Sequence, residues 1–355
     1  MNLDDVRARI DEIDREIVAK LNERLTLAGD VAAAKAAEGK PIFMPEREEQ
    51  IFRKLAASNE GPLDEATLRS IYREIISLTR ARQRQLRIAY LGPEATYTEQ
   101  AALKTFGQQI DAQALVTIPD VFAAVTKDEA DYGVIPIENS TGGAVMHSLD
   151  MLAETDLKIV SQVYLPIEHC LIARSPLDAI TEVHSKDQAL IQCRDWLGRN
   201  LPKARQIECD STAQAVRRAG ESEGVAAIAS LLAAEKYGVP VQAQGIQDRS
   251  DNITRFLVIG REPCGRTGDG ADKTSIVFSI RDEVGALERA LQAFSKRELN
   301  LTKIESRPSR KKAWDYLFFA DILGHWDDAS VQEAVTELQL ACPLVKWLGS
   351  YPNVK

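Results

Sequence analysis

The chain has 355 residues, which exceeds the usual size of one hydrophobic core, so we expect two or three domains. Apolar residues make up 45% of it, but no apolar run approaches the about 18 residues that a membrane span needs. The start is acidic and amphipathic, unlike a signal peptide, so we expect a cytoplasmic protein that does not bind membranes. A net charge of −9 argues against a general nucleic-acid binder.

The first long segment predicts one amphipathic helix. Residues 3–38 contain no proline and carry apolar residues at spacings of three and four. Gly39 and Pro41 end the pattern. Such a helix is roughly 50 Å long, too long for a small globule, which indicates pairing with another chain. Further helices are predicted over 45–58 and 63–85.

From Ile88 onward, short buried strands alternate with helices, which predicts an α/β domain with two lobes and a cleft. The strand over 256–259 follows the return from the second lobe, so we expect it to run antiparallel to its neighbours. The other predicted strands cover 88–92, 134–137, 158–160, 169–173 and 225–229, and the helices cover 98–106, 187–199, 211–219 and 230–236.

A glycine-rich polar linker over 263–272 predicts a domain boundary. The unit after it has the order βαββαβ, which is ferredoxin-like. Its predicted elements are strands over 274–280, 301–308 and 314–322, helices over 285–297 and 330–341, and a short final strand.

Cysteine usage argues against a disulfide framework or a zinc site. The thiols are odd in number, widely spaced and include no Cys-x-x-Cys pair. We therefore expect reduced thiols and no metal; the residues are Cys170, Cys193, Cys209, Cys264 and Cys342.

Cationic side chains on the first helix suit an anionic ligand. Arg24 and Lys35 are about three turns apart, so they share a face with roughly 16 Å between their α-carbons and can converge on one anion. Arg7 lies roughly 25 Å before Arg24, so only a partner helix can bring it to that ligand. Thr79 and Gln83 have i,i+4 spacing. The ordinary alternative is a solvated, coiled-coil-like surface.

Taken together, these motifs resemble the all-helical chorismate mutase domain over residues 1–86: Arg7-x-x-Ile10, Glu23-Arg24, Ala34-Lys35, Pro45-Glu-Arg47-Glu48 and Thr79-x3-Gln83. The resemblance implies a dimer with interlocked helices that rearranges chorismate to prephenate without a cofactor. It implies that Arg24 and the partner's Arg7 hold carboxylates, while Lys35 and Gln83 donate to the ether oxygen. Arg47, Glu48 and Thr79 complete the implied pocket, and Met44 stands where some members have a carboxylate.

Polar residues follow a predicted strand at Ile135-Pro-Ile-Glu-Asn-Ser140, and ligands of open α/β sheets bind at such edges. The turn over 92–98 could bind an anion at a helix start, or it could be purely structural. Asp210-Ser-Thr-Ala213 is equally typical of an ordinary helix cap. His184-Ser185 and Gln192 are ambiguous singly.

With Thr254-Arg255-Phe256, these segments resemble prephenate dehydratase over residues 87–264. The implied reaction removes carbon dioxide and the ring hydroxyl from prephenate to leave phenylpyruvate. Thr254 is implied as the acid for the leaving hydroxyl, acting through a polarised hydrogen-bond network, and Arg255 as a carboxylate or structural anchor. Candidates for the network and for substrate binding are Asn139, Ser140, Ser185, Gln192, Ser211 and Thr212. Departures from the family pattern are Ala95 and Lys186-Asp187.

In the last unit, Glu305-Ser-Arg-Pro308 ends a strand and Gly285-Ala-Leu287 starts a helix. A capped helix beside an edge strand is the ordinary alternative. Together the two motifs resemble an ACT regulatory domain, over residues 272–355, of the type that binds phenylalanine in prephenate dehydratases. The implied phenylalanine site consists of Gly285, Ala286, Leu287, Glu305, Ser306, Arg307 and Pro308. Glu288 replaces an apolar residue usual there.

The three resemblances predict an enzyme with both activities, inhibited by phenylalanine and at least dimeric. The alternative is a non-catalytic amino-acid sensor in which a two-lobed domain, of the kind found in periplasmic binding proteins, reports its ligand through a helical dimerisation segment. Retention of Arg24, Lys35, Gln83 and Thr254 together favours the enzyme, because a sensor does not need groups matched to two successive reactions.

Overall fold

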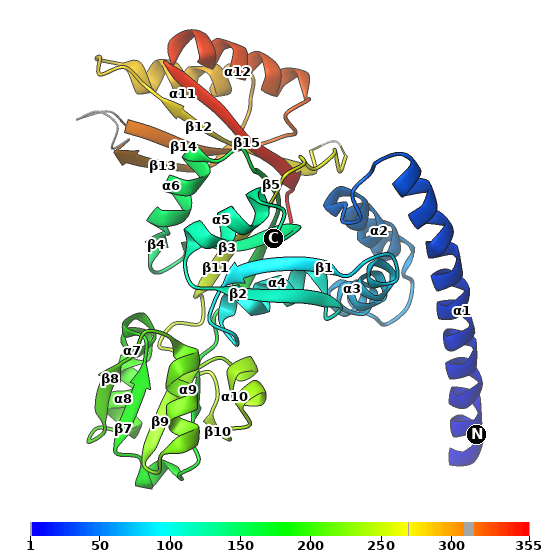
Figure 1. Cartoon of the computed structure of the whole chain (residues 1–355), viewed down its shortest axis with the longest axis vertical. Coiled ribbons are helices and arrows are strands. Elements are labelled where there is room, and N and C mark those ends of the chain that lie inside the picture. Colours follow the sequence, from blue (N-terminus) through cyan, green and yellow to red (C-terminus); the bar gives the residue numbers. More distant parts are fainter. Residues whose placement is uncertain (1, 269, 309–315, 355) are drawn as a thin grey trace. The chain divides into compact units, whose positions relative to one another are not determined.

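The computed structural model describes residues 2–268, 270–308 and 316–354 (Figure 1). The chain forms two compact units, residues 1–86 with 106–111 and residues 87–105 with 112–355. Within the described ranges, no helix combines the length and the apolar composition that a membrane crossing needs.

Three helices form the basis of the first unit: α1 (Leu3–Ala37), α2 (Pro45–Ser58) and α3 (Glu65–Ala81). Proline suits the first position of α2, where an N–H would lack a helical partner. Asp64 caps α3 by accepting a 2.7 Å hydrogen bond from the backbone N–H of Thr67. The three predicted helices are confirmed, although α3 ends at Ala81 rather than near residue 85.

Large apolar side chains of α1 are exposed to solvent along most of its length. The exposed fraction is 50% for Ile10, 50% for Ile17, 58% for Leu27 and 52% for Val31. A contiguous apolar face of this kind usually marks a contact surface. In the described part of the chain, this face is left uncovered.

A six-stranded mixed sheet follows the helices along the chain. Its strands are β1 (Leu86–Leu91), β2 (Ile110–Leu115), β3 (Tyr132–Asn139), β4 (Gly143–Ala144), β5 (Lys158–Pro166) and β11 (Ile253–Gly260). The helices are α4 (Tyr97–Phe106), α5 (Ile118–Thr126) and α6 (Met146–Glu154). The order is β2-β1-β3-β11-β5, with β4 paired to β3. Strand β11 runs antiparallel to both β3 and β5, which confirms the predicted direction.

A five-stranded sheet forms the second lobe, in the order β10-β6-β9-β7-β8. The strands are β6 (Cys170–Ile172), β7 (Glu182–Ser185), β8 (Arg205–Glu208), β9 (Val225–Ala229) and β10 (Val241–Ala243). The helices are η1 (Leu177–Ala179), α7 (Asp187–Gln192), α8 (Arg194–Asn200), α9 (Thr212–Glu221) and α10 (Leu231–Tyr237). The chain enters this lobe after β5 and leaves it before β11, as expected of a two-lobed domain.

The prediction of one helix over 187–199 is wrong, because α7 and α8 are separate helices. Cys193 between them has non-helical dihedral angles of φ −116 and ψ 15. The Asp248 carboxylate accepts hydrogen bonds of 3.1 Å from the backbone N–H groups of Asp195 and Trp196. A residue far along the chain therefore caps α8, which local periodicity does not reveal.

Five strands of the α/β domain escaped prediction, namely β2, β4, β7, β8 and β10. Strands β4, β7 and β10 are only two to four residues long, and β2 and β8 are largely exposed. Edge strand β2 has only partly buried or exposed residues, and β8 is mostly exposed as well. Neither therefore shows the apolar alternation of a half-buried strand. Helices α5 and α6 were also missed. For α5, Thr117 and Asp120 form a capping box that the sequence spacing indicates.

A four-stranded antiparallel sheet forms the last part of the chain, in the order β13-β14-β12-β15. The strands are β12 (Asp272–Ser279), β13 (Leu301–Pro308), β14 (Tyr316–Leu323) and β15 (Leu344–Pro352), and the helices are α11 (Ala286–Ser295) and α12 (Ala329–Ala341). The predicted βαββαβ order is confirmed. The predicted start of one strand at Trp314 lies outside the described residues.

Strand β15 approaches β5 closely, which joins the last sheet to the first. Gly349 has a φ of +149, and a Cβ there would lie 2.7 Å from the backbone nitrogen of Ile159. Lys158 beside it donates a 3.0 Å hydrogen bond to the carbonyl of Trp347. Only glycine suits this backbone contact, because both the conformation and the space exclude a side chain.

We expect Gly349→Ala to lower the free energy of unfolding by about 1–3 kcal/mol, because the methyl group forces two backbones apart. The midpoint of urea unfolding, followed by circular dichroism, measures this. Gly198→Ala is the matched control, since Gly198 lies in α8 with no atom within 4 Å of the added Cβ. A variant at Gly349 as stable as this control would contradict the assigned close contact.

Candidate active sites

In the first unit, α1 and α3 bring a guanidinium and a hydroxyl together. Arg24 Nη1 donates a 2.7 Å hydrogen bond to Thr79 Oγ1, which itself donates to the carbonyl of Ile75. Lys35 Nζ lies 3.1 Å from the carbonyl of Ile42. Burial lowers the pKa of Lys35, and the carboxylate of Glu48 only partly opposes this. The two predicted cations therefore face the same end of the helical unit.

Glu48 and Arg80 form a buried ion pair next to these cations. Arg80 Nη1 lies 2.7 Å from Glu48 Oε1, and Arg80 is only 5% exposed. Burial raises the pKa of Glu48, while the charges of Arg80 and Arg73 act to lower it. Sequence analysis missed Arg73 and Arg80, although their spacing of two helical turns on α3 indicates a shared face. Cations outnumber carboxylates in this cluster, which suits a dianionic ligand.

Three other predicted mutase residues lie on α1, on α2 and just after α3. Arg7 has a side chain that is 67% exposed, and its nearest carboxylate is that of Asp4 at 3.8 Å. Arg47 is exposed on α2. Gln83 lies in the turn directly after α3, two residues beyond the last helical position.

In the second unit, the start of β11 lies beside the end of β3. Thr254 pairs with Asn139 in the strand register, and Asn139 Nδ2 lies 2.8 Å from Thr254 Oγ1. Ser140 joins the same two segments, because its hydroxyl donates to the carbonyl of Asp251 and accepts from the N–H of Ile253. The predicted meeting of these polar residues at one sheet edge is confirmed.

Asn139 and Gln192 belong to one continuous set of side-chain hydrogen bonds. Gln192 Nε2 lies 3.1 Å from Thr141 Oγ1, and Thr141 Oγ1 lies 2.7 Å from Asn139 Oδ1. On its other side, Gln192 Oε1 lies 2.8 Å from Nε2 of the buried His169. His169 Nδ1 lies 2.9 Å from the Tyr97 hydroxyl. Thr141, His169 and Tyr97 were missed, since each carries no local signal of a site.

Two predicted residues of the second lobe make ordinary structural contacts. Ser185 is fully buried, and its hydroxyl donates a 2.6 Å hydrogen bond to the carbonyl of Ile228. Its neighbour His184 lies on β7, with Nε2 2.9 Å from Glu182 Oε2. Both side chains are thus satisfied by the lobe itself.

The segment Ser211-Thr212 starts helix α9. Ser211 is the N-cap, and its hydroxyl accepts a 3.1 Å hydrogen bond from the backbone N–H of Gln214. This geometry is the capping alternative considered from the sequence. Two residues that differ from the prephenate dehydratase pattern also lie at a helix start. Lys186 is the N-cap of α7, and Asp187 is its first residue.

Ala95 and Phe256 differ in how they shape the site. Ala95 has a φ of +64, a conformation that glycine adopts more easily, which accounts for the glycine often found there in the resembling family. Phe256 is 2% exposed and lies in the interior, where it supports β11. Its ring therefore contributes packing next to Thr254.

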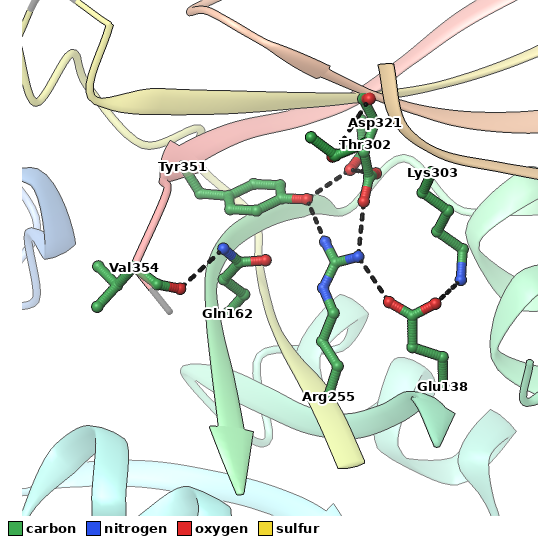
Figure 2. Close-up of polar contacts among 9 residues, drawn as sticks. Glu138, Gln162, Arg255, Thr302, Lys303, Asp321, Tyr351 and Val354 are labelled. Carbon is green, nitrogen blue, oxygen red and sulfur yellow. Dashed lines mark hydrogen bonds and ion pairs between the residues drawn. The ribbon is translucent and has the colours of Figure 1, made fainter. Parts of the chain in front are cut away.

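Arg255 belongs to a buried ion-pair cluster between β11 and the last sheet (Figure 2). Its guanidinium lies 2.6 Å from Asp321 Oδ2, 2.9 Å from Glu138 Oε1 and 2.8 Å from the Tyr351 hydroxyl. The residue is only 3% exposed. Its partners lie on three different strands, β3, β14 and β15, which favours the structural-anchor alternative for Arg255.

Charges around Glu138 stabilise its ionised form. Burial favours the neutral carboxyl, but the Lys303 ammonium and the Arg255 guanidinium outweigh it and hold the pKa of Glu138 below its ordinary value. Burial also disfavours a charged Arg255, yet neighbours such as Tyr351 and Asp321 keep its pKa well above its ordinary value. The cluster therefore stays charged near neutral pH.

Strand β13 presents the predicted phenylalanine motif on two faces. Arg307 is buried and pairs with Asp150 of α6, and Lys303 pairs with Glu138. Ser306 and Pro308 alternate with these residues and are exposed. Gly285, with a φ of +77, is the N-cap of α11, which begins Ala286-Leu287. Glu288 is exposed there, and the described residues show no hydrogen bond between this turn and residues 305–308.

Comparison with protein-family models matches three segments of the chain. Prephenate dehydratase matches residues 88–264, chorismate mutase type II matches residues 6–84, and the ACT domain matches residues 274–339. These three families are the ones that the sequence motifs resemble.

Relatives match nearly the whole chain. A bifunctional chorismate mutase/prephenate dehydratase of Aquifex aeolicus is 46% identical and covers 99% of this chain and 98% of its own length. The protein of the same name from Neisseria gonorrhoeae is 43% identical, with coverage of 98% and 96%. A solved prephenate dehydratase from Arthrobacter aurescens in complex with L-Phe is 33% identical with a TM-score of 0.70, covering 75% of this chain and 90% of that one.

Matches to both enzymatic domains, in one chain and over almost its full length, favour the enzyme over the amino-acid sensor. The chain therefore belongs to the family of bifunctional chorismate mutase/prephenate dehydratases, with a C-terminal ACT domain.

Proposed function

We propose that residues 1–86 convert chorismate to prephenate, that residues 87–264 convert prephenate to phenylpyruvate, and that residues 272–355 bind phenylalanine as an inhibitor. The convergence of Arg24, Lys35 and the Glu48–Arg80 pair supports the first assignment. A Claisen rearrangement needs only a folded conformer and stabilisation of the charge that grows on the ether oxygen. Fixed cations supply both, with Arg47, Thr79 and Gln83 completing the pocket.

The mutase site takes Arg7 from a second copy of the chain. The exposed Arg7 and the uncovered apolar face of α1 support a homodimer in which two long helices lie against each other. Burying Ile10, Ile17 and their neighbours supplies the driving force for this pairing. A dimer built on α1 then delivers each Arg7 to the cluster around Arg24 and Lys35 of its partner.

Mixed dimers test this sharing. We expect Arg7→Ala and Lys35→Ala homodimers to lose mutase activity, while a random equimolar mixture recovers about a quarter of the wild-type rate, since half the dimers then contain one intact site. The measurement is chorismate consumption by mixtures refolded together. The matched control mixes Arg24→Ala with Lys35→Ala, which leaves every site defective. Equal rates in the two mixtures would contradict a shared site.

For the dehydratase, the hydrogen bond between Thr254 and Asn139 carries the assignment. Loss of the ring hydroxyl needs a proton donor at the leaving oxygen. Thr254 provides it, while Asn139, Ser140, Gln192, Ser211 and Thr212 hold the substrate or the loops around it. Ser185 and Phe256 support the two lobes from inside, and Arg255 anchors the strand that bears Thr254.

Replacing Thr254 separates the two activities. We expect Thr254→Val to lower phenylpyruvate formation by roughly 10²–10⁴-fold, the usual contribution of a positioned acid, with chorismate consumption unchanged. Thr254→Ser keeps the hydroxyl and should retain most of the activity. Both products are followed separately from chorismate. Wild-type dehydratase turnover in Thr254→Val would refute the assigned role.

Inhibition by phenylalanine involves Gly285, Ala286, Leu287, Glu305, Ser306, Arg307 and Pro308. The ACT match and the relative solved in complex with L-Phe support this assignment. Gly285 lets an amino acid approach the backbone, and a second copy of the domain brings the two segments together. Ion pairs from Lys303 and Arg307 to the dehydratase then connect the binding strand with the catalytic sheet.

Titration calorimetry tests the site with two variants of one ion pair. We expect Arg307→Ala to weaken phenylalanine binding about tenfold, because a charge-assisted contact contributes roughly that much. Asp150→Asn breaks the same pair but leaves the Arg307 guanidinium in place, so it should bind phenylalanine as wild type. Unchanged affinity in Arg307→Ala would move the site elsewhere, and equal weakening in both variants would make Arg307 an indirect contributor.

A further inference from the structure

We propose that His169 is a positioning residue for the dehydratase: its Nε2 proton begins a one-way chain of hydrogen bonds that ends on the Thr254 oxygen and leaves the Thr254 proton free for the substrate. This inference rests on the proposed role of Thr254. The chain runs from His169 through Gln192, Thr141 and Asn139. Each donor and acceptor in it follows from the chemistry of its neighbours.

Asn139 sets the direction. The backbone N–H groups of Thr141 and Gly142 lie 3.0 and 2.8 Å from one atom of its amide. Backbone N–H groups only donate, so that atom is Oδ1. The other amide atom is therefore Nδ2, which donates to Thr254 Oγ1 and to Asn252 Oδ1, each at 2.8 Å. Thr254 is thus an acceptor from Asn139.

Thr141 passes the direction on to Gln192. Its hydroxyl lies 2.7 Å from Asn139 Oδ1, which can only accept, so Thr141 donates its single proton there. In the 3.1 Å hydrogen bond between Thr141 and Gln192, the donor must then be Gln192 Nε2 and the acceptor Thr141 Oγ1. The Gln192 amide consequently presents Oε1 to His169, at 2.8 Å.

His169 must therefore carry a proton on Nε2. Its Nδ1 lies 2.9 Å from the Tyr97 hydroxyl, which is also 2.8 Å from the carbonyl of Glu168. When the ring is neutral, Tyr97 donates to Nδ1; when it is charged, Nδ1 donates to Tyr97, which donates to Glu168. Burial lowers the pKa of His169, with the Gln192 bond partly opposing this, so the ring is neutral near pH 7.

The arrangement makes Thr254 a better proton donor. Hydrogen bonds that all point the same way polarise one another, and the last acceptor in the chain has a more acidic proton of its own. In the described residues, Thr254 Oγ1 accepts from Asn139 and has no acceptor for its proton. That proton is left to the hydroxyl that departs from the substrate. A hydroxyl is otherwise a poor acid.

Two replacements interrupt the chain at distant points. His169→Leu removes the Nε2–H donor, and Thr141→Val removes the hydroxyl of an exposed residue whose loss does not threaten folding. We expect each to lower kcat for phenylpyruvate formation by roughly 10- to 100-fold with KM nearly unchanged, since the chain acts on proton donation rather than on binding. Because both interrupt one chain, the double variant should be no slower than the slower single variant.

Conservative variants separate the proposed role from a structural one. His169→Gln keeps a donor near Nε2, and Thr141→Ser keeps the hydroxyl, so both should recover most of the lost kcat. Circular dichroism and urea unfolding of the same samples report folding, because the mutase helices belong to a separate compact unit. Thr336→Val, on the exposed side of α12, is the matched control and should leave kcat unchanged. The proposal would be refuted if Thr141→Val had the wild-type kcat. It would also be refuted if the reduction of kcat in the double variant equalled the product of the two single reductions.

The tautomer can also be observed directly. The sequence contains only 4 histidines, so ¹⁵N-histidine spectra of the full-length protein resolve His169 by comparison with the His169→Gln variant. A proton on Nε2, in the neutral or the charged ring, agrees with the proposal. A neutral ring protonated on Nδ1 overturns it. If Thr254→Val is inactive while Thr141→Val is normal, the acid assignment stands and only the chain fails.

Discussion

Strand β11 imposes the constraint on which the dehydratase depends. It runs antiparallel between β3 and β5, so its first residues meet the last residues of β3. Because side chains alternate along a strand, the Thr254–Asn139 pair and the Arg255–Glu138 pair face opposite sides of the sheet. One side holds the polar chain of the active site, and the other holds the ion pairs to the ACT sheet. If the pairing register of β11 shifted by one residue, Thr254 and Arg255 would each face the opposite side of the sheet.

The Arg255 cluster connects the ACT sheet with strands β3 and β11 (Figure 2). Burying charges costs desolvation, and replacing such a cluster by apolar residues often costs no stability. Its value here is orientation: Asp321 and Tyr351 of the ACT sheet hold Arg255, and Lys303 holds Glu138. Lys303 of β13 and Asp321 of β14 therefore contact the residues that directly neighbour Asn139 and Thr254.

The mutase unit contains a cluster of cationic side chains instead of a chain of hydrogen bonds. Its reaction requires no proton transfer, so a fixed cluster of cations is sufficient. Arg24 and Lys35 come from one long helix, and Glu48 and Arg80 hold the neighbouring helices in place. The length of α1 places Arg7 out of reach of its own cluster, and its apolar face remains exposed. The same helix therefore carries two cations of the cluster and an exposed apolar face.

Apolar periodicity was enough to predict the long helix, and the order of predicted strands and helices was enough to predict the α/β domain and the βαββαβ unit. The direction of β11 was predicted from the return of the chain from the second lobe. Segment order and motifs also predicted the meeting of Asn139 and Thr254. Only the tertiary structure showed the helix break at Cys193 and the ion pairs of Arg255. It also showed that His169, Thr141 and Tyr97 belong to the hydrogen-bond chain. These features arise from contacts between residues far apart in the chain, and such contacts leave no local pattern in the sequence.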